Sequence, residues 1–166
     1  MAEAEGANAK TMSIIVTKGT LDWAYPPFIL ATTAAAMGVG VTMFFTFYGL
    51  PLLLKKLDLQ VTPLGNPAMK MPMMGMHMAM PNLAAMLPGA TAGATTMMKN
   101  LIANKGVASI EQLRDLAIEA EVDMIACQMT MDLFEYKLED MIAGPRLGGA
   151  ATYIESALKS DINLYI

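Results

Sequence analysis

The pattern of apolar and polar positions divides the chain into short apolar runs and longer periodic stretches. The runs over residues 13–18, 39–47, 122–126 and 162–166 are short and hold many branched residues, which is typical of buried strands. A shorter run over 59–64 predicts a further strand. Strands that alternate with helices predict an α/β fold. We therefore expect a single three-layer domain, with a mostly parallel sheet of about five strands and helices on both faces.

The periodic stretches between these runs predict helices, and several carry end signals. Gly38 and Gly106 are expected just past helix ends, and Ser109-Ile110-Glu111-Gln112 is a capping box that opens an amphipathic helix. Pro26 and Pro27 fit a helix only near its first turn. The expected helices span residues 20–37, 50–57, 91–105, 109–120, 130–142 and 150–159.

Cys127, the only cysteine, ends the apolar run over 122–126. Thr130 is the expected N-cap of the next helix, in which Phe134, Leu138, Met141 and Ile142 repeat at helical spacing. Cys127 therefore falls at the carboxyl end of a predicted strand, which is the edge where open α/β sheets bind ligands. A helix N-terminus at this place favours a thiolate over a thiol. The nearby carboxylate of Asp132 opposes that effect. The other interpretation of Cys127 is an inert, buried thiol.

Other candidate residues follow the first two strands. Lys18 and Gly19 follow one strand, and Tyr48 and Gly49 follow the other. The right-handed crossover rule brings these loops to the same edge of the sheet as Cys127. Lys18 could balance an anionic sulfur or lie solvated, and Tyr48 could donate a hydrogen bond or only pack. The substrate-binding candidates are Lys18, Gly19, Tyr48, Gly49, Gln128, Met129 and Thr130.

An insertion over residues 65–89 interrupts the pattern with four prolines and eight methionines. We expect no regular element there. Three interpretations stay open: a mobile apolar flap over the Cys127 end of the sheet, a docking surface for a protein or membrane, and a soft-metal site at His77 with Met76 and Met78. A Cys-His dyad would need His77 to fold over Cys127. We expect no bound metal and no cofactor.

Composition narrows the class of protein. The chain is 55% hydrophobic with a mean hydropathy of +0.43, and residues 23–54 carry no charge. A stretch of that length could span a membrane, but Pro26-Pro27 and Gly38-Val39-Gly40 interrupt it. The interruptions favour a helix, a tight turn and a buried strand in a soluble protein. A net charge of −4 argues against nucleic acid as a partner. One cysteine excludes an internal disulfide and suits the cytoplasm. Residues 1–12 are expected to be a flexible tail without a signal peptide, ahead of the domain over 13–166.

Several motifs together resemble the DsrE/DsrF-like sulfur-relay family. They are Ile14-Ile15-Val16-Thr17-Lys18-Gly19, Phe44-Phe45-Thr46-Phe47-Tyr48-Gly49, the Met/Pro-rich insertion and Ala126-Cys127-Gln128-Met129-Thr130. The phenylalanine-rich strand and the insertion are similar to the branch often labelled peroxiredoxin-like, although the chain holds no Thr-x-x-Cys peroxidatic motif. Some members of that branch carry a second cysteine, and this chain does not.

The resemblance implies a sulfurtransferase or sulfur carrier with Cys127 as the nucleophile and persulfide position. It implies homo-oligomers that are fed by rhodanese-like donors and deliver sulfur to TusA-type carriers in sulfur oxidation. Whether the chain is itself an enzyme stays open, and so does peripheral contact with a membrane. The alternative function is a non-catalytic adaptor, oligomeric or membrane-associated, that docks through its Met-rich surface.

Overall fold

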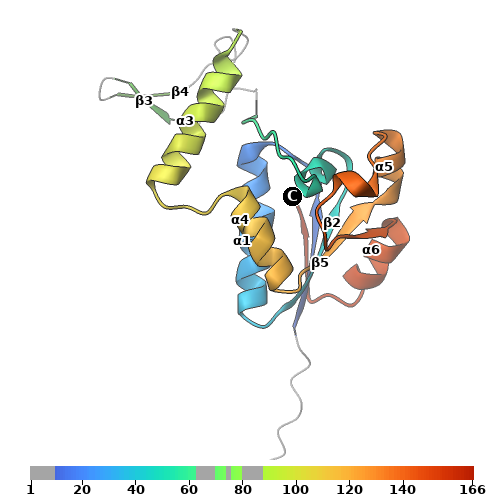
Figure 1. Ribbon diagram of the computed structural model, residues 1–166. Helices are drawn as coiled ribbons and strands as arrows, with labels where there is room; N and C mark the ends of the chain where they lie inside the picture. Colours follow the sequence, from blue (N-terminus) through green and yellow to red (C-terminus); the bar gives the residue numbers. More distant parts are fainter. Residues whose placement is uncertain (1–9, 63–69, 74–75, 80–87) are drawn as a thin grey trace, which may run out of the picture. The chain divides into compact units, whose positions relative to one another are not determined.

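The computed structural model describes residues 10–62, 70–73, 76–79 and 88–166 (Figure 1). By its contacts the chain divides into two compact units, of which one covers residues up to 19, 23–57 and 110–166, and the other covers 20–22 and 58–109. The first unit holds a five-stranded, all-parallel sheet in the order β6-β5-β2-β1-β7. Its strands are β1 (Thr11–Val16), β2 (Gly40–Phe45), β5 (Asp123–Cys127), β6 (Arg146–Gly148) and β7 (Ile162–Tyr165).

The parallel α/β sheet predicted from the sequence is confirmed, with small differences at the strand ends. β1 begins at Thr11, two residues before the expected start, because Thr11 pairs with Gly40 of β2. β6 was not predicted, since its three residues are too few to show a pattern. The register that matters for the site pairs Phe45 of β2 with Ala126 of β5.

Helices cover both faces of the sheet, as the three-layer prediction requires (Figure 1). Helices α1 (Leu21–Ala36) and α4 (Ile110–Glu119) lie on one face, and α6 (Ala150–Ala157) lies on the other. Side chains alternate accordingly along each strand. Phe45 of β2 faces α1, where its ring lies 5.8 Å from that of Phe28. The next residue back, Phe44, faces α6 and stacks on Tyr153 at 5.2 Å.

Helix α1 corrects the expectation for Pro26 and Pro27, which lie inside the helix, beyond its first turn. Each proline removes one backbone hydrogen bond. The helix continues because its inner side chains are completely buried, which favours the packed helix over a break. These buried side chains are Ala24, Phe28 and Ala31.

The helix that follows Cys127 is shorter than predicted. Helix α5 covers Gln128–Leu133, and Cys127 itself is its N-cap residue, so the prediction of Thr130 as the N-cap was wrong. The prediction of a helix through residue 142 was also wrong, because Glu135 takes a left-handed conformation with φ of 57°. A 3₁₀ turn, η2 (Leu138–Asp140), follows.

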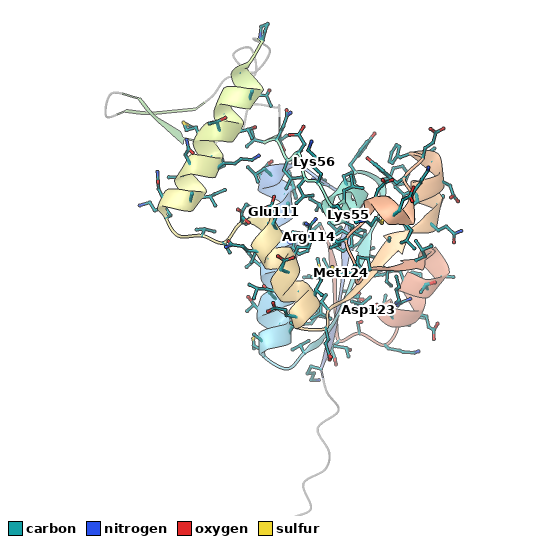
Figure 2. The ribbon with its side chains drawn as sticks, in the orientation of Figure 1. Lys55, Lys56, Glu111, Arg114, Asp123 and Met124 are labelled. Carbon is teal, nitrogen blue, oxygen red and sulfur yellow. The ribbon has the colours of Figure 1, made fainter. Side chains whose placement is uncertain are left out.

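Of residues 50–57, expected to form a short helix, only 50–53 are helical, as the end of the 3₁₀ helix η1 (Phe47–Leu53), so the prediction was wrong for 54–57. The buried guanidinium of Arg114 on α4 supports the end of η1, and Figure 2 labels this residue. Its Nη1 donates to the carbonyls of Leu54 at 2.7 Å and Leu52 at 3.2 Å. Burial lowers the pKa of Arg114, although the carboxylates of Asp115 and Glu111 act in the opposite direction.

The second unit holds helix α3 (Ala90–Asn104) and an antiparallel pair, β3 (Lys70–Met73) with β4 (Met76–Ala79). This pair corrects the expectation of no regular element in the insertion. Both strands are edges, where a proline is tolerated, and Pro72 pairs opposite His77. The remaining predictions for the insertion, a flap, a docking surface or a metal site, depend on side chains outside the described part.

The strand expected over 59–64 is absent from its described part, residues 59–62. The backbone N–H groups there donate to side chains instead of to a neighbouring strand. Val61 donates to the Thr95 hydroxyl at 3.1 Å, and Thr62 donates to the Asp22 carboxylate at 2.9 Å. These bonds satisfy the segment without a sheet.

Within the described ranges, no helix is long and apolar enough to cross a membrane. The uncharged stretch over 23–54 forms most of α1, then β2 and η1.

Candidate functional site

Cys127 lies where β5 ends and α5 begins. Its backbone is extended, with φ of −67° and ψ of 111°, so the chain turns into the helix directly after it. The side chain faces α6 and packs with Phe44, Ile125 and Tyr153. Only 3% of Cys127 is exposed. The sulfur therefore lies at the carboxyl edge of the sheet, as predicted, but under a cover of aromatic side chains.

Two threonine hydroxyls hydrogen-bond to the Cys127 thiol, and they also contact each other. Thr130 is completely buried, and its Oγ1 lies 3.2 Å from Oγ1 of Thr46. The backbone N–H of Phe47 donates to the same Thr130 oxygen at 3.1 Å. The bond from Phe47 uses a lone pair of this oxygen, so the Thr130 hydroxyl can still donate its proton, either to the sulfur or to Thr46. Thr130 does not cap α5 because it lies inside the helix, three residues after the N-cap Cys127.

Hydrogen bonding sets the ionisation of Cys127. Burial raises the pKa of the thiol, but the hydroxyls of Thr130 and Thr46 and the backbone N–H groups of Thr130 and Met129 lower it. The hydrogen bonds prevail, so the pKa lies below the ordinary value for cysteine. Donors directed at a sulfur stabilise its anion. Cys127 is therefore better suited to form a nucleophilic thiolate than an ordinary buried thiol is.

The loops after β1 and β2 touch through their glycines. A Cβ on Gly19 would lie 2.2 Å from the carbonyl oxygen of Tyr48, and a Cβ on Gly49 would lie 2.2 Å from that of Val16. The Val16 carbonyl accepts a hydrogen bond from the N–H of Thr46 at 3.0 Å. Gly19 and Gly49 thus allow the close approach that places Thr46 beside Cys127.

A cavity of about 580 Å³ opens between the ends of β1 and β2 and helix α6. Lys18 and Tyr48, two of the predicted substrate-binding residues, contribute to its wall. The ammonium of Lys18, however, lies 3.2 Å from the ring centroid of Trp23, in a cation–π contact. The lining residues are Ile15, Thr17, Lys18, Phe44, Thr46, Phe47, Tyr48, Ala150, Tyr153, Ile154 and Tyr165.

The structure brings together some of the predicted residues and separates others. Thr130 and the backbone of Met129 bond to Cys127, whereas the side chains of Gln128 and Met129 are exposed. Asp132 is also exposed. Sequence reasoning missed Thr46, Phe44 and Tyr153 as site residues. For Thr46 a signal was present, since it follows the second strand directly as Cys127 ends the strand beside it.

A largely exposed aromatic cluster, in which Tyr136 is half-buried, borders the site. It consists of Phe47 and Tyr48 from η1 with Phe134 and Tyr136 from the segment after α5. The Tyr48 and Phe134 rings stack at 5.9 Å, and Phe47 meets Phe134 edge-on at 6.4 Å. Tyr48 is 70% exposed, and Met129 next to Thr130 is 60% exposed. Large exposed apolar patches are typical of contact surfaces.

Two other candidates for binding are weaker. Arg146, close to Gly148-Gly149 ahead of α6, forms a two-pronged ion pair with Asp123, with both N···O distances at 2.7 Å, and is not left free to hold an anion. In the part of the chain that the structure covers, no group of three or more His, Cys, Asp and Glu side chains could hold a metal.

Comparison with known proteins identifies the family. The model of the DsrE/DsrF/DrsH-like family matches residues 8–165. The chain belongs to this family. Among family relatives, "Sulfur carrier protein DsrE2" of Allochromatium vinosum is 60% identical over 157 residues, which cover 95% of this chain and 98% of that protein.

Two further matches extend the comparison. "Uncharacterized protein YrkE" of Bacillus subtilis is 32% identical over 169 residues, which cover 95% of this chain and 97% of that protein. The crystal structure of the ychN protein from E. coli aligns with a TM-score of 0.51 at 10% identity, and covers 95% of this chain and 99% of that one. This last likeness concerns the fold alone.

Proposed function

We propose that this chain is a sulfur carrier that holds sulfane sulfur as a persulfide on Cys127. The observation that carries the proposal is the set of hydroxyl and N–H donors around the thiol, which lowers its pKa. The relative from Allochromatium vinosum named a sulfur carrier supports the same role. A nucleophilic thiolate is the chemical requirement for taking sulfur from another protein or a small molecule.

The reaction is a transfer of sulfur between thiols. The Cys127 thiolate attacks the outer sulfur of a donor persulfide, R–S–SH. A new S–S bond forms at Cys127, the donor's S–S bond breaks, and its electron pair leaves with the donor thiolate. The reverse exchange then delivers the sulfur to an acceptor thiolate. The Thr46 and Thr130 hydroxyls that stabilise the thiolate can also stabilise the persulfide anion, and burial shields it from solvent.

The partners follow from the family resemblance. We propose a rhodanese-like protein as donor and a TusA-type carrier as acceptor, in cytoplasmic sulfur oxidation. The aromatic cluster of Phe47, Tyr48, Phe134 and Tyr136 supports contact with another protein, and we propose that part of this apolar surface is buried in a homo-oligomer. Whether transfer is catalytic in its own right depends on turnover with a donor and an acceptor.

The alternative function is a non-catalytic adaptor that docks through the Met-rich insertion. The side chains that would form this surface, within residues 65–89, lie outside the described part of the chain. Persulfide formation distinguishes the two functions, because an adaptor has no need of a reactive thiol.

Intact-mass measurement after incubation with inorganic polysulfide tests the proposal. Wild type should gain the mass of a sulfur atom, and the Cys127→Ser variant should gain none. Circular dichroism of the variant serves as the control for folding. A wild type that gains no sulfur, or a serine variant that gains as much as wild type, would overturn the proposal.

A further inference from the structure

The cavity between the strand ends and α6 is larger than sulfur transfer alone requires. Its volume of about 580 Å³ falls in the range of sites for organic molecules, and far exceeds what a sulfide or thiosulfate ion fills. Ile15, Phe44 and Tyr153 line its inner part, and Ile154 lines it from α6. These side chains offer an apolar, partly aromatic surface to an organic group.

The charges around the cavity restrict the ligand further. Among the residues that the structure describes, its lining contains no carboxylate side chain and one cation, Lys18, whose ammonium lies over Trp23. The other polar groups in the lining are hydroxyls, including those of Thr17 and Thr46. A ligand with several charges would lose its hydration there without gaining ionic partners. The cavity therefore fits an uncharged, apolar body.

The wall of the cavity and the surroundings of Cys127 share three side chains. Phe44 and Tyr153 line the cavity and pack with Cys127, and Thr46 lines it and hydrogen-bonds to the thiol. Tyr153 is held in place by a 3.0 Å hydrogen bond between its hydroxyl and that of Ser13. A molecule in the cavity would thus lie against the groups that position the sulfur.

We infer that the cavity binds a low-molecular-weight organic persulfide with an uncharged, apolar substituent, and that this molecule loads Cys127. This inference rests on the proposed function. Cys127 is 3% exposed and does not itself line the cavity, so the step requires a shared wall side chain, Phe44, Thr46 or Tyr153, to move aside. The Cys127 thiolate then attacks the outer sulfur of R–S–SH, the S–S bond of the donor breaks, and R–S⁻ leaves with the electron pair and takes up a proton from solvent. Sulfur moves between two thiols, so no outside oxidant or reductant is needed.

Filling the cavity from α6 tests the inference. Ala150 lines the cavity and is exposed, while the adjacent Ala151 is exposed and lies outside the lining. A helix turns about 100° per residue, so tryptophan at 150 enters the cavity and tryptophan at 151 projects elsewhere. The full-length wild type, Ala150→Trp and Ala151→Trp are each treated with benzyl hydropersulfide, glutathione persulfide or inorganic polysulfide. Intact mass then follows the rate of sulfur uptake.

Wild type and Ala151→Trp should load from benzyl hydropersulfide about tenfold faster than from glutathione persulfide, whose charges the cavity does not match. Ala150→Trp should load from benzyl hydropersulfide about tenfold more slowly than Ala151→Trp, and Ala151→Trp should keep the wild-type polysulfide rate within about twofold. Equal benzyl rates for the two tryptophan variants would overturn the inference, as would a wild type that shows no preference for the benzyl donor. Loading from polysulfide in either case would leave the proposed function intact, whereas no loading from any donor would refute both.

Discussion

Replacing Gly49 by alanine should both destabilise the fold and raise the pKa of Cys127. The added Cβ would lie 2.2 Å from the carbonyl oxygen of Val16, whereas real Cβ contacts essentially never fall below 3.0 Å. The backbone must therefore move. The same carbonyl accepts the N–H of Thr46 at 3.0 Å, so the movement displaces the residue that hydrogen-bonds to the thiol.

The size of the effect follows from the nature of the obstacle. The obstacle is the backbone carbonyl of Val16 at the end of β1, which cannot rotate away as a flexible side chain can. Overpacking of this kind costs about 1–3 kcal/mol. For a chain of this length, that cost lowers the melting temperature by roughly 2–12 °C. Displacement of Thr46 weakens one of the bonds that lower the pKa of Cys127, so the pKa should rise and the thiol should react more slowly at neutral pH.

Thermal unfolding and the rate of alkylation by iodoacetamide measure the two effects. Gly40→Ala is the matched control, because its Cβ would lie 3.6 Å from Cγ2 of Thr11, an ordinary contact in the same strand layer. The control should keep the alkylation rate of wild type. If Gly49→Ala melts and reacts as wild type does, the close approach of the two loops is not what positions Thr46.

Two further predictions concern the thiol and the end of η1. Thr46→Val removes a donor that lowers the pKa of Cys127, so the curve of alkylation rate against pH should move to higher pH, with a lower rate at neutral pH. Arg114→Met leaves the carbonyls of Leu52 and Leu54 without their donor, and should reduce the free energy of unfolding in urea by about 1–3 kcal/mol.

Each of these predictions has a matched control variant. Thr42→Val, in β2 on the same face as Thr46, should leave the pH curve in place. Arg146→Met breaks only an exposed ion pair with Asp123 and should cost at most about 1 kcal/mol. Equal curves for the two valine variants, or equal stability losses for the two methionine variants, would contradict the structural argument.

The sequence was sufficient to predict β1, β2, β5 and β7 of the sheet and the position of Cys127, because these depend on local patterns. The apolar run before Cys127 is a continuous signal for a buried strand, and the crossover rule then places the loops after β1, β2 and β5 at one edge. The end of α5 could not be predicted, since Glu135 takes a left-handed conformation that usually marks glycine or asparagine. The prediction that Pro26 and Pro27 lie near the first turn of their helix was wrong because the burial of α1 outweighed this local rule.

The surroundings of the thiol were harder to predict because they depend on register and packing. Thr46 lies beside Cys127 only because Phe45 pairs with Ala126, and pattern reasoning gives strands without their register. Tyr153 reaches the site from α6, and nothing in its local sequence distinguishes it from an ordinary core tyrosine. Gln128 and Met129, predicted as substrate-binding residues, have exposed side chains, and Met129 contributes its backbone N–H to the thiol.

The central claim is that Cys127 carries sulfur and passes it on. The most direct measurement loads the full-length protein with polysulfide, removes the donor, adds a purified TusA-type carrier and weighs both proteins over time. The account predicts that the mass of a sulfur atom leaves this protein and appears on the carrier, and that Cys127→Ser supports neither loading nor transfer. Transfer that persists in the serine variant, or a wild-type protein that never acquires sulfur, would contradict it.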